Sequence, residues 1–250
     1  MTIIISYEEF AELQKKYPRT KSNDFLMPAE IKKLIDFRKL SYFADENALF
    51  CFVQREGFSK LIFRLRDYCA TLPAFSESFS TPIAAYLVYR EDKPPAEDEK
   101  WLLSQGFSHS LKLVRYTAHN IKSERREDGI STATAREAYS MLFEFFGAEE
   151  MDLPCMEMYD GSAFCTRADY GSLSGVIYDL GHTRIVAVSP AVRGQGLGGR
   201  LYSAFVSNAL EKGKNAVFSE WIRPDNFSSI AMFEKLGFVK DTLVTDCYVI

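Results

Sequence analysis

The sequence is poor in the residues that build metal sites, disulfide frameworks and nucleic-acid surfaces. It has three scattered histidines and five cysteines, an odd number without a C-x-x-C pair, which argues against a zinc site and a disulfide scaffold. The formal net charge is -4, so neither nucleic acid nor an anionic membrane is an expected partner. These absences favour a metal-free protein of the reducing cytoplasm.

Long apolar runs are missing as well. No run approaches the roughly 18 residues of a membrane span, and the first residues lack the basic start and apolar length of a signal peptide. Hydrophobic residues nevertheless make up 47% of the chain, so a sizeable core can be buried. A length of 250 residues suits two domains of ordinary size.

A charged segment near the midpoint, residues 121–129, is almost free of apolar side chains and predicts a linker. Residues 1–130 carry 20 basic and 19 acidic side chains, whereas residues 131–250 carry 10 and 15. The negative charge therefore comes from the second half. We expect two domains of unlike surface, at residues 1–125 and 126–250.

Helix and strand signals alternate along both halves. The capping box Ser6-x-x-Glu9 predicts a helix that Pro18 ends, and Thr134-x-x-Glu137 predicts another that Gly147 ends. Four further helices are expected. One begins at residue 28, one covers 99–104, one ends at about residue 212 and one ends at residue 236. Strands are expected over 48–53, 60–65, 83–88, 111–116, 162–168, 172–179, 183–189 and 216–222, with a final strand at the end. This pattern predicts an α/β (α+β) fold, with mixed sheets flanked by helices.

The two halves repeat short motifs in the same order. The matching pairs are Phe50-Cys51 with Phe164-Cys165, Gly57 with Gly171, and Gln105-Gly106-Phe107 with Leu236-Gly237-Phe238. About fifteen residues separate Asp67 from Pro82, whereas nearly forty separate Asp179 from Ala216. The first half is therefore expected to be a degenerate copy without one strand, a glycine loop and a helix.

That glycine loop is the most chemically informative segment of the sequence. A β-branched strand ends at Ser189-Pro190, and residues 193–200 (Arg-Gly-Gln-Gly-Leu-Gly-Gly-Arg) lead into a helix. Glycines let backbone N–H groups converge on a ligand, and a helix N-terminus favours negative charge. The segment predicts an anion site, although a plain strand-to-helix turn with glycines is the simpler alternative.

Two familiar phosphate loops fit the segment poorly. There is no Gly-Lys-Ser/Thr, which excludes a nucleoside-triphosphate P-loop. Gly194, Gly196 and Gly199 satisfy G-x-G-x-x-G, and Glu220 follows at the spacing of a dinucleotide-binding fold. Five residues separate the strand from the first glycine, however, and only 30 residues follow Glu220, too few to complete a doubly wound sheet.

The segment resembles the GNAT N-acetyltransferase superfamily. The pyrophosphate motif Arg/Gln-x-x-Gly-x-Gly/Ala is met by residues 193–198, after the strand Val-Ala-Val-Ser-Pro of 186–190. A second signature, an Asn before a helix that ends in Lys-x-Gly-Phe, is met by Asn226 and residues 235–238. The resemblance covers residues 131–250 well. The first half resembles a degenerate GNAT domain, as in tandem GNAT proteins.

The resemblance implies a site for acetyl-CoA. The amides of residues 194–198 would hold the coenzyme pyrophosphate, and the backbone of residues 186–188 would pair with the pantetheine arm. The coenzyme-binding residues so implied are Val186, Ala187, Val188, Arg193, Gly194, Gln195, Gly196, Leu197, Gly198, Gly199, Asn226, Ser229 and Phe233. Asn226 has the alternative role of a helix cap, and Phe233 that of a core residue.

The resemblance also suggests catalytic residues. Acetyl transfer needs a neutral amine and therefore a general base, for which Glu220 and His182 are candidates. An exposed strand carboxylate and a surface loop histidine are the simpler alternatives. Many family members carry Tyr where this sequence has Phe233, so Tyr248 or Tyr202 would protonate the leaving thiolate, or no acid is needed.

The function so implied is an acetyl-CoA-dependent N-acyltransferase that moves an acetyl group to an amine of a small molecule or peptide. A coenzyme A-binding module without catalysis and a Fem-type aminoacyl transferase are the alternatives. The intact coenzyme loop and the lack of a basic face disfavour the second, which would take tRNA as its donor. We expect one active site in the C-terminal domain, no metal, no nucleic acid and no membrane, with homodimer formation left open.

Overall fold

The computed structural model describes residues 2–4, 6–17, 21–23, 26–55, 57–73, 81–119, 121, 129–150, 156, 163–167, 171–179, 184–213 and 217–250. These residues form two compact units. Unit 1 comprises Met1–Lys112 and Leu243–Ile250, and unit 2 comprises Leu113–Thr242. Most of the expected linker, residues 122–128, lies outside the described residues.

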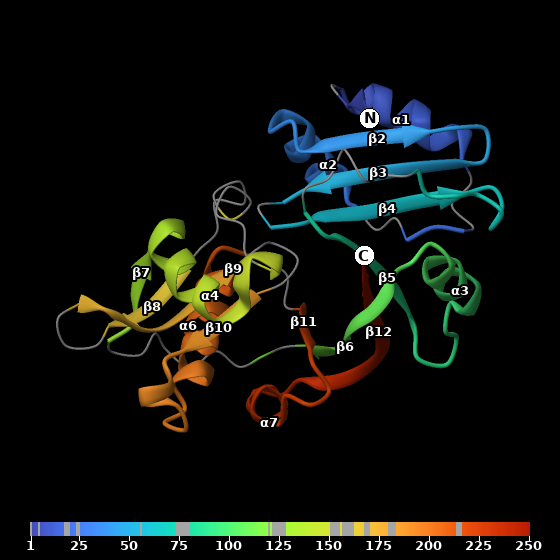
Figure 1. Ribbon diagram of the computed structural model, residues 1–250. Coiled ribbons are helices and arrows are strands. Elements are labelled where there is room, and N and C mark those ends of the chain that lie inside the picture. The colour runs from blue at the N-terminus through green and yellow to red at the C-terminus, as the bar shows by residue number, and fades with distance from the viewer. Residues whose placement is uncertain are drawn as a thin grey trace. The chain divides into compact units, whose positions relative to one another are not determined.

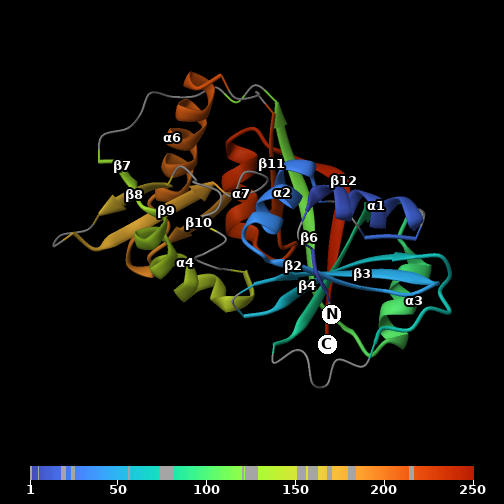
Figure 2. The same cartoon turned by 90° about the horizontal axis from the view of Figure 1, so that it is seen from above.

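Unit 1 is a sheet with helices on both sides. Its helices are α1 (Tyr7–Lys16), α2 (Pro28–Asp36) and α3 (Ala96–Ser104), and its strands are β1 (Thr2–Ile3), β2 (Leu40–Ala44), β3 (Ala48–Gln54), β4 (Ser59–Leu65), β5 (Ile83–Arg90) and most of β12 (Val239–Val249). The strand order is β1-β2-β3-β4-β5-β12, antiparallel except for the parallel pair β4–β5. Figures 1 and 2 show α1 and α2 on one side of β2–β4 and α3 on the other.

The unit 1 core explains why β3 is almost wholly apolar. Both faces of a strand covered by helices must be buried, so neighbouring residues of β3 are equally inaccessible to solvent. Phe50 and Phe63 pack against Trp101 of α3, with ring centroids 6.0 and 4.8 Å away. The indole N–H of Trp101 donates to the carbonyl of Ala70 at 2.8 Å, which satisfies its buried polar atom.

Unit 2 contains a second sheet. Its strands are β7 (Ser131–Ala133), β8 (Ala163–Arg167), β9 (Leu173–Asp179) and β10 (Arg184–Val188), in the antiparallel order β10-β9-β8-β7. Helices α4 (Ala135–Glu150) and α6 (Leu197–Glu211) lie on opposite faces of this sheet (Figure 2). Unit 2 also holds β11 (Val217–Ile222), α7 (Phe227–Lys235) and most of β6 (Ser108–His119).

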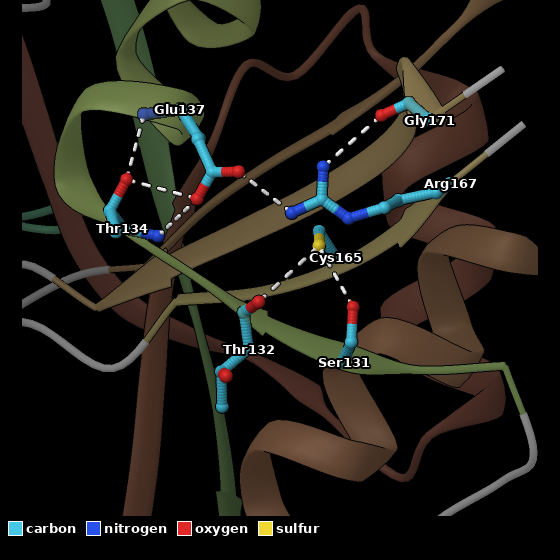
Figure 3. Close-up of polar contacts among 7 residues, drawn as sticks. All are labelled: Ser131, Thr132, Thr134, Glu137, Cys165, Arg167 and Gly171. Carbon is cyan, nitrogen blue, oxygen red and sulfur yellow. Dashed lines mark hydrogen bonds and ion pairs between the residues drawn. The ribbon is translucent and has the colours of Figure 1, made fainter.

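The start of α4 confirms a capping box (Figure 3). The Glu137 amide donates to Thr134 Oγ1 at 3.2 Å, and Glu137 Oε2 accepts the Thr134 amide at 2.9 Å. Arg167 of β8 donates to Glu137 Oε1 at 2.8 Å. The predicted end of this helix is wrong, because α4 continues past Gly147 to Glu150. Gly147 lies within the helix, so it does not provide the left-handed residue that ends helices.

The repeat in the sequence corresponds to a repeat in backbone geometry. Gly106 and Gly237 follow α3 and α7 with φ of 92° and 89°. In both places the next phenylalanine amide donates to a carbonyl five residues back, at 3.1 Å for Phe107 and 2.9 Å for Phe238. These are the same helix-ending motif at equivalent positions of the two halves.

The two halves also exchange their last strands. Within unit 1, residues 243–249 of β12, the last strand of the second half, pair with β5 of the first half. Within unit 2, residues 114–119 of β6, the last strand of the first half, pair with β11 of the second half. The compact units therefore contain strands from both halves of the chain.

Several expected absences can be stated only for the described part. No described helix has the length and apolar character that a membrane crossing requires. The described residues contain no cluster of three or more potential metal-binding side chains. Cys51, Cys69, Cys165 and Cys247 are free thiols.

Candidate functional site

The glycine loop of unit 2 leads directly into α6. A short 3-10 turn, Pro190–Val192, follows β10, and Gly194 and Gly196 then take φ of 78° and 75°. This left-handed conformation favours glycine, and a Cβ at either position would meet no atom within 4 Å. The loop surface above these two glycines is therefore open, with the backbone itself exposed.

The first turn of α6 presents unbonded amides. Gly196 caps the helix without a side-chain hydrogen bond, and the first turn has no acidic residue. Among the described residues, the first amide to donate is that of Arg200, to the Gly196 carbonyl at 3.1 Å. The N–H groups of residues 194–199 are thus available at the positive end of the helix dipole. This arrangement suits an anionic ligand, as predicted.

Strand β10 offers an open backbone edge beside this loop. It pairs with β9 on one side and is the last strand of its sheet. The Arg184 amide points away from β9, because it donates to Glu220 at 3.1 Å. Since hydrogen-bonding direction alternates along a strand, the N–H and C=O groups of Val186 face the same edge. The Val188 carbonyl faces it too and accepts from Arg193 Nε at 3.0 Å.

Gly198 lies where this edge meets α6 and α7. A Cβ there would stand 2.9 Å from Met232 Sδ, and 3.7 and 3.8 Å from methyls of Val188 and Val186. The second glycine of the motif therefore permits close helix packing, while Gly194 and Gly196 keep the loop open. Sequence reasoning missed Met232, because a methionine on an amphipathic helix carries no signal beyond core packing.

The start of β10 belongs to a buried cluster of charged and phenolic groups. Glu220 is 2% exposed and accepts hydrogen bonds from the Tyr202 hydroxyl and from Arg184 Nη1, the latter at 3.2 Å. Arg184 Nε is 3.7 Å from Asp179 Oδ1. The guanidinium also lies over the rings of Phe205 and Phe218, 5.3 and 5.5 Å from their centroids. Arg184 was not singled out in the sequence, where it is one arginine at the start of a strand.

Burial dominates the acidity of this cluster. It raises the pKa of Glu220 to about 7, although Arg184 and the hydrogen bond from Tyr202 oppose the shift. Burial and the nearby Glu220 charge also raise the pKa of Tyr202, so its hydroxyl stays protonated. A carboxylate with this pKa matches the proton affinity that a general base requires. Its nearly complete burial, however, separates it from solvent.

The residues around α7 are placed as follows. Asn226 is exposed and caps α7 by accepting the Ser229 amide at 3.1 Å, which is the simpler of its two predicted roles. Phe233 is 6% exposed and packs edge-on against Tyr202 and Phe238, with centroids 5.0 Å away in both cases. Phe233 is thus part of an aromatic core that includes Tyr202.

Of the remaining predicted catalytic residues, one lies in unit 1 and the other lies outside the described residues. Tyr248 belongs to unit 1, where it is buried and its hydroxyl is hydrogen-bonded to Glu99. Burial and this hydrogen bond raise its pKa. His182 lies outside the described residues. The structure therefore brings Glu220 and Tyr202 together, while the roles of Tyr248 and His182 stay predictions.

Comparison with known proteins identifies the family of the domain in the second half of the chain. The model of the Acetyltransferase (GNAT) family matches residues 132–238, which include the loop, Glu220 and Phe233. Residues 132–238 form a GNAT domain. A search of curated proteins found no significant match to the chain.

Solved structures show that the fold extends beyond the GNAT domain. A tandem GNAT protein from the clavulanic acid biosynthesis pathway covers 100% of this chain and 97% of its own, with a TM-score of 0.63 and 11% identity. A GCN5-related N-acetyltransferase from Kribbella flavida covers 85% of this chain and 90% of its own, with a TM-score of 0.56 and 15% identity. A GCN5-related N-acetyltransferase-like protein from Streptococcus suis covers 96% of this chain and 99% of its own, with a TM-score of 0.55 and 13% identity. The whole chain therefore has a tandem GNAT fold.

Proposed function

We propose that the protein is an acetyl-CoA-dependent N-acyltransferase that acetylates an amine of a small molecule or peptide. The observation that carries the proposal is the start of α6, where open left-handed glycines and unbonded amides meet the free edge of β10. The GNAT match over residues 132–238 supplies the reaction class. The amine class of the acceptor rests on the family alone.

The residues around the loop fit coenzyme A. The amides of residues 194–199 and the side chain of Arg193 would hold the pyrophosphate, since the amides are unbonded and Arg193 is exposed beside the helix N-terminus. The outward N–H and C=O groups of Val186 would bind the amide-containing pantetheine arm in the manner of an added strand. When bound, acetyl-CoA supplies an activated acyl thioester.

The protein must also accept a proton from the acceptor ammonium, because only the neutral amine has a free lone pair with which to attack the thioester. The sequence predicts Glu220 or His182 for this step. A proton donor to the thiolate is less necessary, since a thiol with a pKa near 8.5 is a tolerable leaving group. The buried, apolar environment of Phe233 is compatible with a reaction that uses no acid at this position.

Thermal unfolding with and without acetyl-CoA tests coenzyme binding. We expect the ligand to raise the melting temperature by binding linkage, and Gly196→Glu to abolish the rise by placing a bulky anion on the loop. Absence of a rise at millimolar acetyl-CoA would refute the proposal.

Thiol release over a panel of amines then tests catalysis. We expect release that depends on both acetyl-CoA and the acceptor amine. Coenzyme binding without turnover of any amine would instead favour a non-catalytic coenzyme A module. The phenylalanine at position 233, which cannot donate a proton, agrees with that alternative.

A further inference from the structure

In the described residues, no backbone ladder joins β10 to β11. Strand β10 pairs with β9, and β11 pairs with β6. The two strands lie at the ends of different sheets. Without a ladder, their spacing depends on side chains.

Glu220 of β11 provides that connection. Its Oε2 accepts the backbone N–H of Arg184, the first residue of β10, at 3.1 Å. Its Oε1 accepts from Arg184 Nη1 at 3.2 Å and from the Tyr202 hydroxyl of α6. Arg184 Nη1 also donates to the Ser219 carbonyl of β11 at 3.3 Å. One carboxylate therefore contacts β10 and α6 from β11, and we call Glu220, Arg184 and Tyr202 the carboxylate clamp.

The clamp acts on the elements that form the coenzyme site. Tyr202 lies in the helix that begins at the glycine loop, so its hydrogen bond fixes the position of that helix relative to β11. Arg184 begins the strand whose outward edge at Val186 is open. The start of β10 is thus fastened to β11, while the following residues keep their outward backbone groups for a ligand.

We propose that Glu220 is a positioning residue, which sets the spacing of β10, β11 and the start of α6 for coenzyme binding through Arg184 and Tyr202. It does not take the proton of the acceptor amine. Three donor groups already occupy its oxygens, and the residue is 2% exposed, so an amine cannot reach it without displacing the clamp. This inference rests on the proposed function, whose coenzyme site the clamp would shape.

The test replaces Glu220 by Gln and measures two quantities. Calorimetry gives the Kd for acetyl-CoA, and steady-state kinetics gives KM for acetyl-CoA, kcat and its pH profile. We expect Kd and KM to rise about tenfold or more, kcat to fall less than about threefold, and the acid limb of the kcat profile to remain. A fall in kcat of about a hundredfold or more with unchanged Kd and a lost acid limb would identify a general base and overturn the inference. Unchanged Kd and kcat would overturn it as well.

Asp241→Asn is the matched control. Asp241 is also a carboxylate held by an arginine and a hydroxyl in unit 2, with Arg115 Nε at 2.5 Å and Thr117 Oγ1 at 2.8 Å, but it contacts β6. We expect its Kd for acetyl-CoA to match that of the unaltered protein. An equal loss of affinity in both variants would show a general effect on folding and overturn the specific role of the clamp.

Tyr202→Phe keeps the test decisive if Glu220→Gln does not fold. It preserves the ring that packs on Phe233 and removes only one donor of the clamp. We expect a smaller rise in Kd with kcat retained, and an unchanged Kd would overturn the inference. Lack of acetyl-CoA binding by the unaltered protein would refute the proposed function itself, which separates the two failures.

Discussion

Gly196→Ala should separate the conformational role of the loop glycines from their role in ligand binding. Gly196 has φ of 75°, and an added Cβ would meet no atom within 4 Å. The substitution therefore causes no clash in the free protein, and its cost there is backbone strain alone. Gly213, just after α6, has φ of 69° and equally open surroundings, which makes Gly213→Ala the matched control.

The expected strain is about 1–2 kcal/mol for an L-residue in the left-handed region. In a chain of 250 residues, each kcal/mol shifts the melting temperature by about 2–4 °C. Both variants should therefore unfold about 2–8 °C below the unaltered protein. At one hundred times Kd, a bound ligand contributes about 2.7 kcal/mol, so acetyl-CoA should raise the melting temperature of Gly213→Ala by about 5–11 °C.

Gly196→Ala should show a smaller rise, because the methyl group occupies the open surface above the loop. The assay is thermal unfolding with a series of acetyl-CoA concentrations, supported by urea denaturation without ligand. Equal ligand-induced rises in the two variants would refute the assignment of this loop as the coenzyme site. A much larger stability loss in Gly196→Ala than in Gly213→Ala, without ligand, would refute the claim that strain is the whole cost.

Three further outcomes are expected from urea denaturation. Burial raises the folded pKa of Glu220 from 4.5 to about 7, so its contribution to stability is present below about pH 4.5 and is lost as pH rises through about 7. Relative to Glu220→Gln, the free energy of unfolding of the unaltered protein should fall by about 3 kcal/mol between these pH values. Parallel curves of stability against pH for the two proteins would contradict this. Thr134→Ala removes the cap of α4 and should cost about 1 kcal/mol, whereas no loss would contradict the capping box. Gly175→Ala would place a Cβ 2.9 Å from Leu201 Cδ1 and should cost about 1–3 kcal/mol, and an unchanged stability would contradict the close packing of α6 on β9.

Local signals in the sequence predicted the features that depend on neighbouring residues. Both predicted N-caps formed as expected, at Ser6 and at Thr134, because a cap is closed within three residues. Strand β2 was missed, since its Leu-Ser-Tyr-Phe-Ala sequence does not alternate and it is fixed by pairing with β3. The end of α4 was missed at Gly147, because a glycine ends a helix only where the chain can turn into the left-handed region.

The glycine loop was predictable because its function resides in the backbone. Residue types that permit positive φ and unbonded amides are visible in a linear motif, and the structure places them at the start of α6. The environment of Glu220 was not predictable. Its burial and its contacts to Arg184 and Tyr202 join residues 18 to 36 positions apart, which no spacing rule connects.

The sequence by itself determined the two related halves, the GNAT motifs and the absence of the glycine loop from the first half, since each of these is written in residue order. Only the tertiary structure decided how the halves are completed. The final strand β12 pairs with β5 in unit 1, and β6 pairs with β11 in unit 2. Strand pairing is satisfied by backbone hydrogen bonds that any suitable strand can supply, so the choice of partner is set by the fold as a whole.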